Sequence, residues 1–275
     1  MDEPSSKDRL MTTFFLLLFL AGAAVHILQA AGEGERLGVV AGSLIFGLLA
    51  LSHAWYLLGW RTATAMFGFV YGASWTAQTL AIATHLATPY AYTEALGPRI
   101  GLVPFTVPLT WFTMFYFSTV IANLIGEGKP SPTIQKGWWV ACMAFLTALV
   151  VTAWDLAMHP WLLLQQKAWV FKYPGPYFGI PFAAFLAGLQ TAFIISVVWR
   201  LVETSLPDPP PDRLTRLATA IPVLAYGVLA LPFVFVGTPE ATRILTPFSM
   251  GIPVLAALGR LTQMPQPLSF PEPEP

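Results

Sequence analysis

Apolar segments long enough to cross a bilayer alternate with short polar segments along this chain of 275 residues. A spanning helix needs about twenty predominantly apolar residues, because the hydrocarbon core is about 30 Å thick. Eight segments meet this requirement and predict an all-α, polytopic helical membrane protein. They are Leu10–Ala31, Leu37–Trp60, Ala63–Thr88, Pro104–Ile125, Trp138–Met158, Phe178–Trp199, Leu217–Val236 and Ile244–Leu261.

The two ends of the chain bound this helical domain. The first apolar segment is longer than the core of a signal peptide, which is about 7–15 residues, so we expect it to be retained. The small residues 21–24 resemble a cleavage region, and cleavage there would leave seven spans. We predict one helical membrane domain over residues 1–263 and a disordered proline-rich tail over residues 264–275.

The composition agrees with a membrane protein and excludes other classes. Hydrophobic residues make up 56% of the chain and charged residues 10%, against about 25% charged in a soluble domain. The net charge of zero gives no indication of nucleic-acid binding. A single cysteine, Cys142, excludes a disulfide framework and a cysteine metal site.

Lysine and arginine predict the orientation. Eight spans place both termini on one side, with nine of the fourteen basic residues there and five on the other side. We therefore predict cytoplasmic termini, in a bacterial inner membrane. The last turns of the first, third and fifth spans then meet at the opposite face, and with them His26, His85 and Asp155.

Asp155 is the one carboxylate that these eight segments contain. An ionisable group within a span is costly and marks a functional site by default. A carboxyl group partly removed from water can hold a proton and donate it; the alternative is a structural cap on a neighbouring helix. His159 follows four residues later on the same helical face, and we expect Pro160 to end that helix.

The histidines do not suggest a metal site. No HxxH or HxxxH spacing occurs, and a metal would have to be assembled from His26, His85, His159 and Asp155 on three helices. We expect no metal and no cofactor.

Aromatic residues are concentrated after Asp155. They fit either an aromatic belt at the lipid interface or a pocket for an apolar polyene whose walls stabilise a developing cation. The residues are Trp154, Trp161, Trp169, Phe171, Tyr177 and Phe178.

The loop after the third span contains Tyr90, Tyr92, Glu94 and Arg99. Glu94 and Arg99 form either a solvated salt bridge or, with the two tyrosines, a lid over the same site. The third span is the most polar, with Gln78 and His85 among its polar residues, which is typical of a helix facing the bundle interior.

Two sequence blocks carry a resemblance to a known family. The first is YAYTEALGPR at Tyr90–Arg99, followed by VPLTW at Val107–Trp111; the second is WDL at Trp154–Leu156, followed by GPYFGIP at Gly175–Pro181. The chain resembles the integral-membrane carotenoid 1,2-hydratases, including the hydratases of bacterioruberin synthesis. The resemblance implies a hydro-lyase that adds water across the terminal C1–C2 double bond of an acyclic carotenoid, needs no redox cofactor, and works in the bilayer beside other carotenoid enzymes.

We predict a site from the residues and the resemblance together. Asp155 is the predicted acid, with His159 and Glu94 as further catalytic residues. The predicted substrate-binding residues are Tyr90, Tyr92, Trp154, Trp169, Phe171, Tyr177, Gln78 and His85.

The chain departs from the family pattern at four positions. Gln78 stands where the family tends to have glutamate, His159 where it has a second aspartate, Ala184 where it has asparagine, and Phe171 where it has tryptophan. These differences leave open a non-catalytic carotenoid- or lipid-binding paralogue. A small membrane transporter is the alternative from another class.

Overall fold

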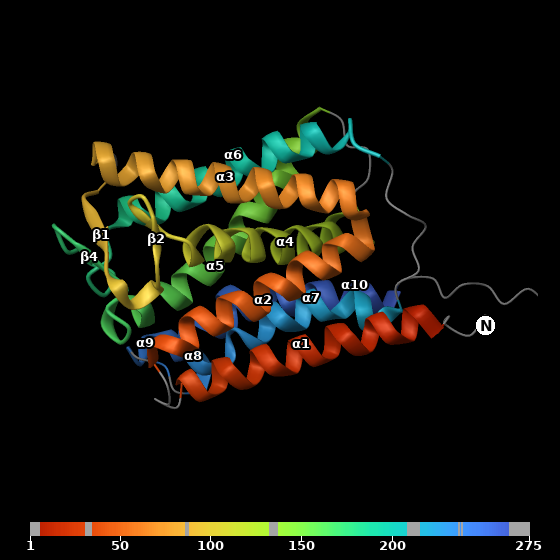
Figure 1. Ribbon diagram of the computed structural model, residues 1–275, viewed down its shortest axis with the longest axis horizontal. Coiled ribbons are helices and arrows are strands. Elements are labelled where there is room, and N and C mark those ends of the chain that lie inside the picture. The colour runs from red at the N-terminus through yellow and green to blue at the C-terminus, as the bar shows by residue number, and fades with distance from the viewer. Residues whose placement is uncertain are drawn as a thin grey trace, which may run out of the picture.

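The computed structural model describes residues 6–30, 35–85, 88–131, 137–207, 215–235, 237 and 239–263. Within these ranges the chain is almost entirely helical (Figure 1). The helices are α1 (Ser6–Ala30), α2 (Glu35–Leu58), α3 (Trp60–Thr84), α4 (Thr106–Glu127), α5 (Trp138–Leu164), α6 (Phe182–Glu203), α7 (Arg216–Val228), α8 (Leu231–Phe235), α9 (Ala241–Thr246) and α10 (Ile252–Gln263), with a π-helical turn at Pro247–Gly251.

Seven helical segments of the described chain are long and apolar enough to cross a membrane, which confirms an integral membrane protein of the all-α class. The segment Arg216–Phe235 joins α7 to α8, and Ala241–Gln263 joins α9, the π-turn and α10. The more polar α3, predicted as a span, is not among these seven, although it has 25 residues and runs alongside them in Figure 1. The helix α1 begins and α10 ends at the same end of the bundle (Figure 1).

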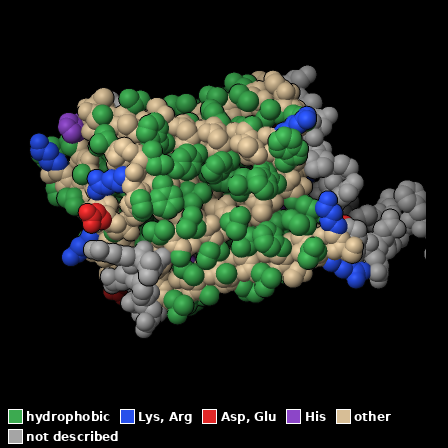
Figure 2. All heavy atoms as spheres, viewed as in Figure 1, with side chains coloured by type: hydrophobic (Ala, Val, Ile, Leu, Met, Phe, Trp, Pro, Cys, Tyr) green, Lys and Arg blue, Asp and Glu red, His purple; other side chains and the backbone are tan. Residues whose placement is uncertain are grey.

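The surface agrees with a position across a bilayer. Hydrophobic side chains cover the middle of the visible face, whereas lysine and arginine lie toward its two ends (Figure 2). This distribution is typical of a protein whose middle is in contact with lipid. The predicted tail at 264–275 and two basic residues used for the orientation, Lys136 and Arg213, lie outside the described residues.

The helix α4 forms the centre of the bundle. It packs against α2, α3, α5, α7 and α10, and its large side chains, among them Phe112, Phe115 and Tyr116, are fully buried. Tyr116 donates a hydrogen bond to Nδ1 of His53 at 2.6 Å, and Nε2 of His53 lies 2.9 Å from the carbonyl oxygen of Ala218. The imidazole therefore joins α2, α4 and α7 and belongs to the core.

Two loops cover one end of the bundle, at residues 88–104 and 165–181; together they are called the cover below (Figure 1). Strand β1 (Tyr90–Tyr92) pairs antiparallel with β4 (Trp169–Phe171), so that Tyr90 faces Phe171 and Tyr92 faces Trp169. The first loop also contains a 3₁₀ turn (Glu94–Leu96) and the hairpin of β2 (Arg99–Ile100) with β3 (Val103–Pro104).

The prediction that Pro160 ends the fifth span was wrong. The helix α5 continues through it to Leu164. A proline inside a helix leaves the carbonyl four residues earlier without its usual N–H donor. In this chain that carbonyl belongs to Leu156, and the hydroxyl of Tyr177 donates to it at 2.7 Å. The cover thus replaces the missing hydrogen bond, as membrane helices require.

Candidate functional site

A cavity of about 240 Å³ lies at the covered end of the bundle. Helices α1 to α6 all contribute to its wall, together with β1 and β4 of the cover. Its aromatic lining consists of Phe46, Tyr90, Tyr92, Trp111, Trp154, Trp161, Trp169 and Phe171.

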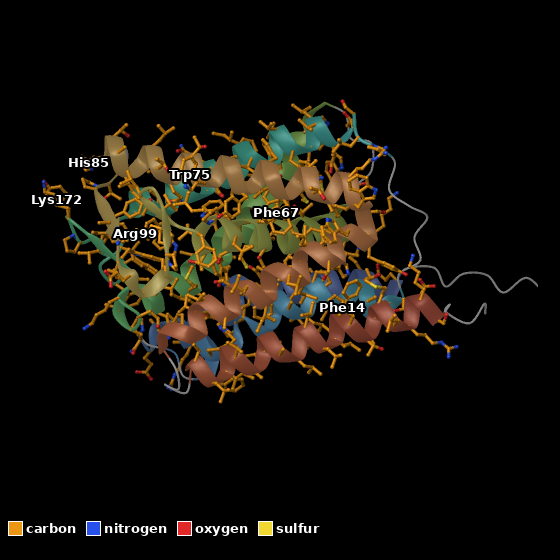
Figure 3. All side chains as sticks on the ribbon, in the orientation of Figure 1. Phe14, Phe67, Trp75, His85, Arg99 and Lys172 are labelled. Carbon is orange, nitrogen blue, oxygen red and sulfur yellow. The ribbon has the colours of Figure 1, made fainter. Side chains whose placement is uncertain are left out.

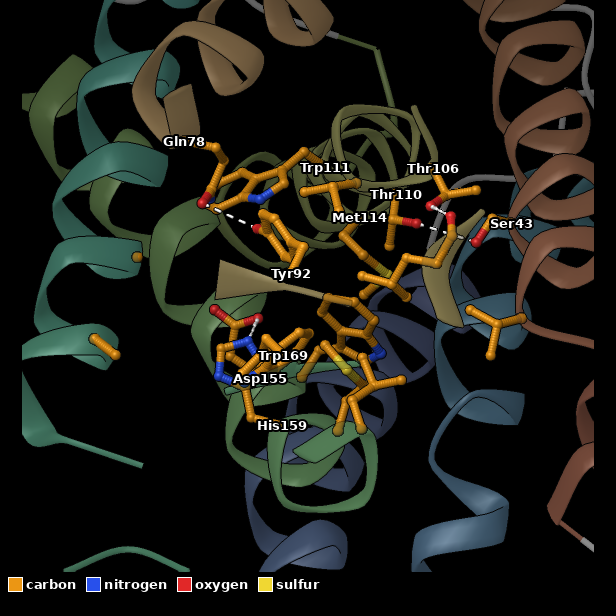
Figure 4. A pocket seen from close by; sticks show the side chains of 18 of the residues that line it. Ser43, Gln78, Tyr92, Thr106, Thr110, Trp111, Met114, Asp155, His159 and Trp169 are labelled. Atoms are coloured by element: carbon orange, nitrogen blue, oxygen red, sulfur yellow. Dashed lines mark hydrogen bonds and ion pairs between the residues drawn. The ribbon is translucent and has the colours of Figure 1, made fainter. Parts of the chain in front are cut away.

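Asp155 and His159 lie side by side in this wall (Figure 4). Their spacing of four residues places them on one face of α5, and Oδ1 of Asp155 is 3.4 Å from Nε2 of His159. Asp155 is only 5% exposed. The imidazole contacts the edge of Trp169, with ring centroids 5.0 Å apart, and packs on Phe185 at 5.5 Å.

Gly188 on α6 leaves space for this carboxyl group. A Cβ atom at position 188 would lie 3.3 Å from Oδ2 of Asp155, so a larger side chain would press on the carboxyl. The pair therefore fills a fitted position between α5 and α6. Uncharged aromatic side chains surround this carboxyl group. In such surroundings it can donate a proton to an apolar molecule.

Gln78 joins α3 to the cover above the pair. The hydroxyl of Tyr92 donates to Oε1 of Gln78 at 3.1 Å (Figure 4), and the hydroxyl of Tyr90 donates to the same oxygen. Burial raises the pKa of Tyr90 to about 12. Burial, and then the charges of Tyr90 and Asp155, raise the pKa of Tyr92 well above its ordinary value. Both tyrosines are therefore neutral hydrogen-bond donors.

Eight of the predicted site residues line this one cavity although the chain separates them widely. They are Gln78, Tyr90, Tyr92, Trp154, Asp155, His159, Trp169 and Phe171.

Three predicted residues lie elsewhere. His85 caps the end of α3 with a left-handed backbone (φ 55°) and is exposed (Figure 3). Glu94 is exposed on the cover. Tyr177 supports α5 from outside the lining and packs against Phe185, with ring centroids 5.2 Å apart.

Of the two alternatives for Glu94 and Arg99, the described residues do not show the salt bridge. Nη2 of Arg99 donates instead to the backbone carbonyl of Tyr92 at 2.6 Å. This hydrogen bond stabilises the turn of the chain after β1, so Arg99 contributes to the structure of the cover.

The first half of the chain supplies lining residues that the sequence did not single out. They include Gln29, Ser43, Thr106, Thr110, Thr113 and Met114. The sequence gives little indication of these residues. Serine and threonine are common in membrane-spanning helices, where their hydroxyl groups often bond a backbone carbonyl of the same helix.

The histidines are not gathered around one point. His26 lines the cavity, with Nε2 3.1 Å from the carbonyl oxygen of Leu229, while His53 lies in the core and His85 at the surface. Across the part of the chain that the structure describes, no group of three His, Cys, Asp or Glu residues is placed to hold a metal ion.

The fold and the cavity define an integral helical membrane protein with an aromatic chamber, whose lining among the described residues includes one carboxyl group, that of Asp155. The family model described as carotenoid biosynthesis protein matches residues 38–258, and the chain belongs to this family. This match covers most of the chain and confirms the prediction of a carotenoid biosynthesis membrane protein. The chain matches no curated protein and no solved structure.

Proposed function

We propose that this protein hydrates the terminal C1–C2 double bond of an acyclic carotenoid and leaves a tertiary alcohol. Membership in the carotenoid biosynthesis family supports the substrate class. The observation that carries the proposal is Asp155, a buried carboxyl group in the wall of an aromatic cavity.

The proposed reaction begins with Asp155 as the acid. Its carboxyl O–H gives a proton to C2 while the electron pair of the double bond forms the new C–H bond. The positive charge left at C1 is tertiary, and a water molecule attacks it through oxygen. The resulting oxonium returns one proton to the carboxylate, either directly or through His159. Atoms and electrons balance without an oxidant or a reductant.

The aromatic wall supports the charged intermediate. Ring faces such as those of Trp154 and Trp169 attract a cation through their quadrupoles, and a desolvated site makes that attraction stronger. The cover restricts water, which limits side reactions of the cation. Glu94 has no part in this mechanism because it lies outside the cavity.

The position of the cavity fits a long substrate. An extended carotenoid is about as long as a bilayer is thick, so its end group lies near one membrane face. Asp155 occurs toward the covered end of the bundle, consistent with that arrangement. We further propose that both termini are cytoplasmic and that the covered end faces the opposite side of a bacterial inner membrane.

Expression in cells that make lycopene tests the proposal. The expected product is heavier than lycopene by one water molecule, and growth in ¹⁸O-labelled water should place the label in the new hydroxyl group. Cells with an empty vector give the background.

Absence of the hydrated product would refute the proposal. Lycopene that copurifies unchanged with the protein would instead favour the non-catalytic paralogue, which the departures at Gln78, His159 and Ala184 suggest.

A further inference from the structure

A second polar group lies across the cavity from the acid. Figure 4 shows Ser43 and Thr110 on the side opposite Asp155 and His159, with Thr110 directed at Ser43. Gln29 of α1 lines the same cavity. The proposed hydration chemistry uses none of these three residues.

The helices hold the Gln29 side chain in a fitted groove. A Cβ atom at Gly38 would lie 2.5 Å from Cγ and 2.9 Å from Cδ of Gln29, and one at Gly42 would lie 4.0 Å from Oε1. The side chain therefore lies flat along α2, over two glycines one turn apart. Gln29 is 5% exposed.

This amide carries an unused donor. Nε2 of Gln29 is buried and has no hydrogen-bond partner among the residues that the structure describes. A buried polar group without a partner is destabilising, so natural proteins pair nearly all of them. The Gln29 side chain has a hydrogen bond with His26, but its fitted N–H donor is left unpaired at the cavity, which indicates a ligand that completes its bonding.

The neighbouring hydroxyl groups have spare capacity as well. Oγ1 of Thr110 donates to Oγ of Ser43 at 3.3 Å, which leaves the Ser43 O–H free to donate elsewhere. Two other threonines of α4 differ: Thr106 donates to the carbonyl of Leu96 at 2.6 Å and Thr113 to that of Leu109 at 2.9 Å. On this wall the free capacity thus lies at Ser43, Thr110 and Gln29, while Nδ1 of His159 and Nε1 of Trp169, elsewhere in the lining, are also buried without a partner among the described residues.

The charge of this wall defines the ligand class. The lining residues from α1, α2 and α4 include no Asp, Glu, Lys or Arg within the described chain. An ion would be left without a counter-charge, which is expensive away from water. A neutral group that both donates and accepts matches an amide beside two hydroxyl groups.

We infer that Gln29, Ser43 and Thr110 form a subsite for a hydroxyl oxygen, taken either from water or from an alcohol on the carotenoid end group. The inference rests on the proposed carotenoid cavity, and it adds an oxygen-binding wall opposite the acid.

A competition experiment tests the subsite. The purified Asp155→Asn protein, which should not convert one pigment into the other, is offered equal amounts of lycopene and its 1-hydroxy derivative, and the retained pigments are quantified by chromatography. This protein should retain the alcohol in about threefold to tenfold excess, as expected for one hydrogen bond. Gln29→Met and Ser43→Ala should bring the ratio close to one.

Ser52→Ala is the matched control. Ser52 lies on α2, as Ser43 does, but it donates to the carbonyl of Leu48 at 2.7 Å and is not part of the lining. Its replacement should therefore leave the ratio of retained alcohol to lycopene unchanged. Thr110→Val provides a further test if either subsite variant fails to accumulate in the membrane.

Two different results would support the inference, and they identify different sources of the bound oxygen. An excess of the alcohol that the variants lose assigns the subsite to the pigment hydroxyl. Equal retention of the two pigments, together with a lower kcat but an unchanged KM for lycopene hydration in the Gln29→Met and Ser43→Ala variants, assigns the subsite to water. Equal retention with unchanged turnover overturns the inference. Failure of wild type to hydrate lycopene refutes the proposed function separately, because the retention ratio is measured in the Asp155→Asn protein and does not depend on turnover.

Discussion

Replacement of Asp155 by asparagine separates its chemistry from its packing. Asparagine has nearly the same shape as aspartate, so it fits beside Gly188 and His159 in the space that the carboxyl group occupies. It cannot give up a proton at the relevant acidity. We expect Asp155→Asn to abolish hydration while the protein still inserts and still retains pigment.

The magnitude follows from the role. A positioned general acid contributes about 10²–10⁴-fold to a rate, which corresponds to about 3–5 kcal/mol of transition-state stabilisation. A carboxyl group in the middle of a span also costs about 2.5–3.5 kcal/mol relative to an apolar residue. The variant should therefore lose at least about 100-fold in rate without any loss of thermal stability in detergent.

The assay compares hydrated pigment per amount of membrane protein in wild type and variant, with lycopene retention as the control for an intact cavity. Conversion by Asp155→Asn at the wild-type rate would refute the reasoning, because Asp155 would then be structural. Loss of both conversion and retention would show that the substitution had damaged the cavity.

Four further predictions follow from other parts of the structure. His159→Gln should keep partial activity, since a neutral side chain can still orient the carboxyl group; complete loss in the same product assay would assign the imidazole an essential proton transfer. Glu94→Gln should give wild-type turnover, and a clear decrease would return this residue to the mechanism. The contribution of Tyr90 and Tyr92 to thermal stability should be lost as the pH rises from about 10 to 12, because both have raised pKa values in the folded state and the unfolded chain loses these protons first; a scan over that range checks the sign. A reporter fused at Gln165 should lie outside the cytoplasm, and a cytoplasmic signal would reverse the proposed orientation.

The sequence predicts most of the helices because a bilayer leaves the backbone few alternatives. The four-residue spacing of Asp155 and His159 also predicts their contact correctly, since i and i+4 are neighbours on any helix. Pro160 misled the prediction because the group that compensates for it, the hydroxyl of Tyr177, comes from a separate loop.

Other features depend on contacts that linear spacing does not reveal. Strands β1 and β4 have three residues each, too few for a periodic signal, and their pairing is fixed only when the helices bring both loops to one end. In the first loop, Arg99 reaches the carbonyl of Tyr92 because the chain turns there, so its distance along the sequence from Glu94 carries no information. The role of Gly38 becomes evident only once α1 is placed beside α2.

The pairing of β1 with β4 also has a consequence for synthesis. Tyr92 leaves the ribosome well before its partner Trp169, which is roughly 77 residues later in the chain. At about 5–20 residues per second, the unpaired strand waits for about 4–15 seconds with its aromatic side chains uncovered. At the start of that interval α1 to α3 are complete and α4 is added during it, but for most of it the chamber has neither its acid nor its second covering strand. A nascent chain therefore acquires the acid and the second strand late, and the wall is complete only when α6 follows.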